Sequence, residues 1–78
     1  MTDLYPAADQ RELLRQAAAA HTAAAADVEA FLRRLPEVPG PADVTEYATL
    51  LSREERARAD RQAAADAAGL ELPSMESE

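Results

Sequence analysis

The sequence predicts an all-α protein, an antiparallel hairpin of two long helices. Alanine, the strongest helix former, fills 20 of the 78 positions. Apolar residues in the first half recur at alternating spacings of four and three, which is typical of a helix face that packs on another helix. The segment 36–41 (PEVPGP) has three prolines and a glycine in six residues, and no helix continues through it. We therefore expect a hairpin domain over 6–69 with its turn at 36–41.

The first helix is expected to begin at Pro6, because proline suits the first turn, where its missing N–H has no helical partner. Residues 1–5 then form an N-terminal cap segment, in which Asp3 can accept from the first N–H groups. From Pro6 to Leu35 no glycine or proline interrupts the helix. Tyr5 has two interpretations, a hydrophobic staple over the first turn or an exposed interface anchor, and both stay open.

One apolar stripe on this first helix has the spacing of a coiled-coil seam. Its members are Leu14, Ala18, His21, Ala25, Val28, Leu32 and Leu35. A second row lies beside the stripe and consists of Leu13, Ala17, Ala20, Ala24 and Phe31. The two rows together make a wide apolar face, and a wide face needs more than one neighbouring helix.

The second helix is expected over 43–68. Asp43 followed by Glu46 has the form of a capping box, and Ser52 followed by Glu55 repeats that form inside the segment. The helix is therefore either continuous or broken near Ser52, and we favour the continuous form because 53–68 contains no helix breaker. Gly69 is expected to end the helix, and residues 70–78 are expected to form an acidic flexible tail.

Large apolar side chains are scarce in this chain. Leu, Val and Phe together supply 13 residues and Ile is absent, so alanine-rich faces bury little area per residue. We expect the hairpin to complete a helical bundle by association with a copy of itself or with a larger protein. The residues expected at this interface, as packing rather than chemistry, are Leu14, Ala18, His21, Ala25, Val28, Leu32, Leu35, Tyr47 and Leu51.

His21, the one histidine, allows two interpretations. It is either a functional group, as a pH-sensitive interface switch or a lone general base, or a partly buried ring that fills the space left by alanines and bonds one neighbour. The second is favoured, because the positions at helical spacing from His21 are all alanine and offer no carboxylate to orient the ring. The Glu-x-x-His pattern of bundle metal sites is absent as well. We expect no enzyme activity, no metal and no cofactor.

The charge balance limits the partners of this chain. Fifteen acidic residues against eight arginines give a net charge of −7, which disfavours nucleic acid and anionic membranes as partners. The arginines within 53–61 are interleaved with acids and have no aromatic neighbours, so this segment is interpreted as a solvated helix face. The first residues show neither a basic nor an apolar region of a signal peptide, and we expect a cytoplasmic protein.

The sequence thus favours a small non-catalytic protein–protein interaction or regulatory module, one that self-associates as a dimer or tetramer or docks on a larger protein. The alternative is an acidic regulator, similar in principle to an antitoxin or a nucleic-acid mimic, that neutralises a basic partner. This alternative is motivated by the acidic excess of 41–78, which hold nine acids and four arginines. A small accessory subunit of an enzyme is a further possibility.

Overall fold

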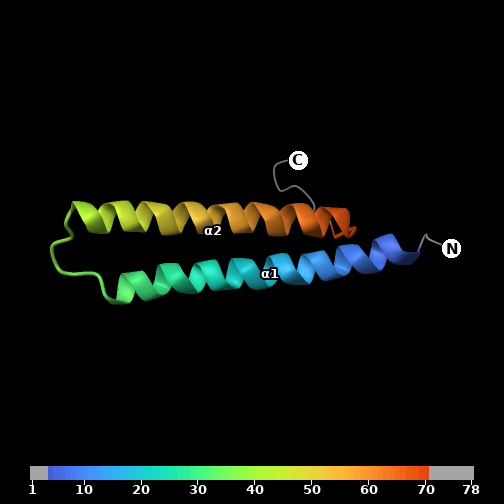
Figure 1. Cartoon of the computed structure of the whole chain (residues 1–78), viewed down its shortest axis with the longest axis horizontal. Coiled ribbons are helices and arrows are strands. Elements are labelled where there is room, and N and C mark those ends of the chain that lie inside the picture. Colours follow the sequence, from blue (N-terminus) through green and yellow to red (C-terminus); the bar gives the residue numbers. More distant parts are fainter. Residues whose placement is uncertain (1–3, 71–78) are drawn as a thin grey trace, which may run out of the picture.

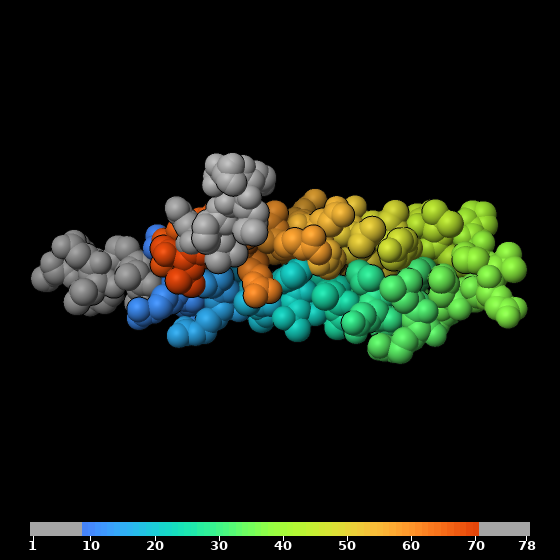
Figure 2. All heavy atoms as spheres, turned by 180° about the vertical axis from the view of Figure 1, so that it is seen from behind, coloured from blue at the N-terminus to red at the C-terminus, as the bar shows by residue number. Residues whose placement is uncertain are grey.

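The computed structural model describes residues 4–70, and their side chains from Asp9 onward. Two helices, α1 (Leu4–Arg33) and α2 (Pro41–Ala67), run antiparallel and side by side along their length (Figure 1). In the space-filling view of Figure 2, their side chains close the space between the two helices. The predicted all-α hairpin is confirmed. Within the described part of the chain, neither helix has an apolar stretch long enough to cross a membrane.

Helix α1 begins two residues earlier than predicted and ends two residues sooner. Leu4 and Tyr5, which were assigned to a cap segment, already belong to the helix, whereas Asp3 and the Tyr5 side chain lie outside the described residues. At the other end, the N–H groups of Arg34 and Leu35 bond to carbonyls three residues back, at 3.1 and 3.3 Å. Leu35 leaves the helix because the residue before a proline is driven toward extended backbone.

The start of α2 differs from the prediction in a way that changes the role of Asp43. The N-cap is Gly40 and the first helical residue is Pro41, so Asp43 stands at the third helical position and is not the cap itself. Its carboxylate accepts a hydrogen bond from the Gly40 N–H at 2.8 Å, which is the side-chain half of a capping box. The prolines and glycine of the turn therefore supply the start signal, and Asp43 reinforces it.

The rest of α2 follows the prediction. The helix is continuous through Ser52, so the alternative with a break there is wrong. It ends in a Schellman motif: Gly69 has a φ of +88°, its N–H bonds to the Asp66 carbonyl at 3.0 Å, and the Leu70 N–H bonds to the Ala65 carbonyl at 2.8 Å. The left-handed φ explains why a glycine occupies this position. The predicted tail lies outside the described residues from residue 71 onward.

The contact between the helices is narrow, and its centre lies between the two predicted apolar rows of α1. Ala24 and Phe31, from the row placed beside the main stripe, are 4% and 2% exposed. The row of α1 that faces α2 is Leu14, Ala17, His21, Ala24, Val28 and Phe31. On α2 the less exposed side chains recur at helical spacing and are Asp43, Leu50, Leu51, Glu54, Ala57, Ala64 and Ala65, followed by the C-cap Ala68. With one neighbour only, α1 presents the middle of its wide face, and both edges remain uncovered.

Candidate functional site

A polar layer crosses the middle of the hairpin, formed by His21, Glu54, Arg58 and Arg61. His21 Nε2 lies 2.7 Å from Glu54 Oε2, and Arg58 Nη2 donates to the same oxygen at 2.8 Å. The Glu54 residue is 8% exposed, and it stands on the seam because it follows Tyr47 by seven residues. Helix geometry thus brings a carboxylate into an otherwise alanine-rich contact, where it is satisfied by two donors.

The fourth member of the polar layer fixes the tautomer of the histidine. Arg61 Nη1 lies 3.2 Å from His21 Nδ1. A guanidinium has donors only, so Nδ1 must accept and carries no proton. The proton of the neutral ring is then on Nε2, which donates to Glu54. Both ring nitrogens are therefore engaged, and neither is directed at an incoming substrate.

The same contacts determine the protonation of Glu54. The hydrogen bond from His21 holds the pKa of the Glu54 carboxyl below its ordinary value of 4.5, and the hydrogen bond and positive charge of Arg58 act in the same direction, while burial opposes them. The carboxylate is therefore ionised at neutral pH and is paired with Arg58. A half-buried polar layer of this kind favours one alignment of two helices over others, because a shift of register would leave its groups unpaired.

Sequence reasoning missed this layer. It considered only positions at helical spacing from His21 and found alanines, whereas the orienting carboxylate comes from the other helix, 33 residues away. The favoured interpretation of His21 as a partly buried ring agrees with its side-chain exposure of 17%, but the ring bonds two neighbours, not one. Arg58 and Arg61 were interpreted from the sequence as part of a solvated face, but in the structure they belong to the polar layer. The available signal was the seven-residue step from Tyr47 to Glu54, which puts both on one face of α2.

A turn-end pocket of about 310 Å³ opens beside the buried Phe31. The Phe31 and Tyr47 rings stack with centroids 5.8 Å apart, but Tyr47 remains 37% exposed. Leu32 and Leu35 are 47% and 38% exposed, although both belong to the predicted seam. The large side chains gather near the turn, where they line an open pocket and form no closed core.

This pocket is one of three along the same edge of the hairpin, which we call the apolar flank. The central pocket has His21, Ala25, Glu29 and Arg61 in its wall, and the open-end pocket joins the two helix ends farthest from the turn. The flank consists of Leu14, Ala18, His21, Ala25, Leu32 and Leu35 from the α1 arm, and Val44, Tyr47, Arg58, Ala65 and Leu70 from the α2 arm. The predicted interface residues outside this set, Val28 and Leu51, are half-buried.

The opposite flank is polar and closed. Arg34 donates to Glu46 at 2.7 Å across it, and the Arg34 guanidinium lies over the Phe31 ring at 5.1 Å. Asp27 precedes Arg34 by seven residues, and Arg53 follows Glu46 by seven residues on α2. The two flanks of the hairpin therefore differ in character, and the three pockets described above lie along the apolar one.

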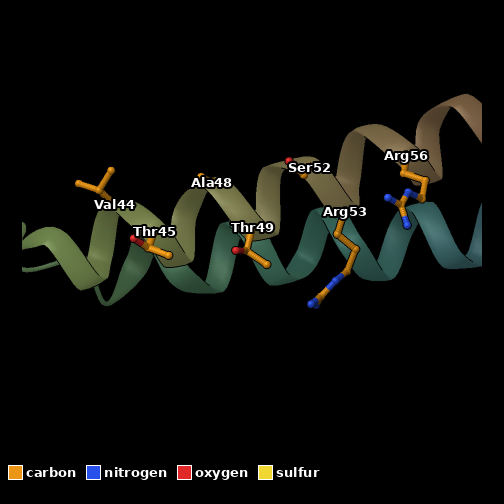
Figure 3. A pocket seen from close by; sticks show the side chains of 7 residues that line it. All are labelled: Val44, Thr45, Ala48, Thr49, Ser52, Arg53 and Arg56. Carbon is orange, nitrogen blue, oxygen red and sulfur yellow. The ribbon is translucent and has the colours of Figure 1, made fainter.

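A further depression lies on the back of α2 (Figure 3). It is lined by α2 residues alone, namely Val44, Thr45, Ala48, Thr49, Ser52, Arg53 and Arg56. Because no second element forms a wall, it is a surface dip between side chains of one helix. Thr49 lies near the middle of this dip and is remote from the apolar flank.

Comparisons with known proteins give no relative from which a role could be carried over. No protein-family model, no curated protein and no solved structure matches this chain. Within residues 4–70, no group of three or more histidines or carboxylates is arranged to hold a metal ion.

Proposed function

We propose that this chain is a non-catalytic protein–protein interaction module, a helical hairpin that completes its core by association through the apolar flank. The observation that carries the proposal is the number of large apolar side chains left in solvent. Among the described residues, those more than a third exposed are Leu13, Leu32, Leu35, Val38, Val44, Tyr47 and Leu70. Against them, the buried apolar side chains are Ala24 and Phe31.

The apolar flank is favoured over the other faces because its pockets lie between two helices. A third helix laid along such a groove contacts both arms at once, which is how bundles bury their cores. The opposite flank is closed by the Arg34–Glu46 ion pair, and the back of α2 has no second wall. Six members of the flank were also predicted from sequence periodicity alone, namely Leu14, Ala18, His21, Ala25, Leu32 and Leu35.

The alternative, an acidic regulator of a basic partner, has the net charge of −7 in its favour. The apolar flank supports it less, because Arg58 and Arg61 line the groove and would repel a basic ligand. Salt separates the two proposals: binding through charge weakens steeply as ionic strength rises, whereas binding through the apolar flank changes little.

The test of the module is its apparent size in an extract of the cells that make it. A complex of either kind, with itself or with another protein, makes the chain elute well above 8.4 kDa. The variant L32E/V44E places two charges in the turn-end pocket and should elute as the free monomer, and T49E on the back of α2 should behave as the unmodified chain. Elution of all three at the free monomer size would overturn the proposal.

A further inference from the structure

We propose that the occupant of the apolar flank is a second copy of this chain, laid antiparallel across the first with the two-fold axis at Ala25. This inference rests on the proposed function and specifies its partner. It follows from two features of the flank that are symmetric about Ala25: a charge pairing and a match of side-chain sizes.

The first feature is charge. Arg61 bonds His21, which precedes Ala25 by four residues, and Glu29 follows Ala25 by four residues. All four residues border the central pocket of about 340 Å³. In an antiparallel pair that crosses at Ala25, the His21 level of one copy faces the Glu29 level of the other. Arg61 of each copy is thereby opposite Glu29 of its partner, and the contact occurs twice.

Glu29 is available for this pairing. Its side chain is 77% exposed and its ion pair with Arg33 is long, at 4.0 Å. Arg61 in turn bonds the His21 ring, and among the ion pairs of residues 9–70 its charge is not matched by a carboxylate. Each copy thus brings a cation and an anion to the flank at mirrored positions, which is the requirement of an isologous interface.

The second feature is shape. Ala18 and Leu32 lie seven residues on either side of Ala25, so Leu32 of each copy meets Ala18 of the other. Leu14 and Leu35 are 11 and 10 residues away, so Leu14 of each copy lies near the level of Leu35 of the other, at the open-end and turn-end pockets. Ala25 at the centre has a small side chain, and small residues allow two helices to approach to about 8 Å.

The length of the contact suits the same arrangement. A contact over 20 residues of α1, from Leu14 to Arg33, spans about 30 Å at 1.5 Å per residue. The result is a four-helix bundle whose core includes the large residues that the single hairpin leaves in water.

A single cysteine tests the position of the axis, because the natural chain has none. In A25C the two thiols face each other across the axis, within the 3.5–4.5 Å Cβ separation of a disulfide after small adjustment. Under mild oxidation we expect most of A25C to become a covalent dimer. T49C, on the back of α2, should remain uncrosslinked at the same concentration. Circular dichroism of both reduced variants checks that each retains the helix content of the unmodified chain.

Light scattering after gel filtration tests the pairing of charges. The unmodified chain should have twice the mass of 8.4 kDa. E29R, which places arginine opposite arginine twice per dimer, should weaken dimerisation at least tenfold. D27R makes the same charge change two residues away on the polar flank and should leave the dimer unchanged.

Three results would overturn the inference: a monomer at millimolar concentration, equal weakening by E29R and D27R, or crosslinking of T49C in place of A25C. The first of these leaves the proposed function standing if the chain still elutes as a large complex in the cell extract, since the occupant is then another protein. Free monomer in both experiments refutes both proposals.

Discussion

Among the described residues, Phe31 is the one large apolar side chain that the hairpin buries, and its truncation is the sharpest test of how the two helices are held. Its ring is 2% exposed, stacks on Tyr47 and lies under the Arg34 guanidinium. Truncation of a buried phenylalanine to alanine costs about 3–5 kcal/mol. We expect F31A to fall in the lower half of that range, because the adjacent turn-end pocket is open and lets water and neighbours fill the space.

The loss expected for F31A is large relative to the free energy of unfolding of the whole chain. A 78-residue chain has a free energy of unfolding of about 4–12 kcal/mol, so F31A should remove a substantial part of it. The assay is urea unfolding followed by circular dichroism, with the free energy obtained by linear extrapolation. All variants are compared at one protein concentration, because association adds to apparent stability.

The matched control is L13A. Leu13 lies on the same helix, is also a large apolar residue, and is 55% exposed, so its truncation should change stability by less than about 1 kcal/mol. If F31A loses no more than L13A, then Phe31 does not anchor the two helices and the packing described above is wrong.

Three further predictions concern single contacts. Folding lowers the pKa of Glu54, so the ionised carboxylate stabilises the fold above its ordinary pKa of 4.5, and this stabilisation is lost as pH falls through the lower pKa of the folded state. The decrease in the free energy of unfolding between pH 7 and pH 3, measured by urea titration, should therefore be smaller in E54Q than in the unmodified chain. G69A forces a φ of +88° on a residue with a Cβ, which should cost about 1–2 kcal/mol in thermal unfolding; a cost near zero would contradict the Schellman end. D43A removes the acceptor of the Gly40 N–H and should cost about 1 kcal/mol, while D43N, which keeps an acceptor, should cost less; equal losses would mean that the hydrogen bond is not the cause.

Sequence alone sufficed for the fold because its signals are local and agree with one another. The proline-rich turn separates two segments that lack helix breakers, and Gly69 marks the end of the second through a backbone conformation that glycine favours. The start of α2 was placed at Asp43 because an acid followed by a glutamate has capping form. Gly40 and Pro41 carry the actual start, since proline fits the first helical position equally well.

The polar layer could not be predicted from the same signals. Whether His21 meets Glu54 depends on how far one helix slides along the other, and alanine rows look alike after a shift of one heptad. The row of α1 that faces α2 is offset from the predicted stripe for a related reason. A wide apolar face does not specify which part of it the single neighbouring helix covers. The exposure of Leu32 and Leu35 follows from that offset.

The concentration dependence of thermal unfolding tests most directly whether the hairpin completes its core with a second copy of itself. Helix content at 222 nm would be followed at two protein concentrations a hundredfold apart. Mass action links folding to association, so the account predicts a higher Tm at the higher concentration, and the loss of this difference in L32E/V44E. An unmodified chain with the same Tm at both concentrations would contradict the account.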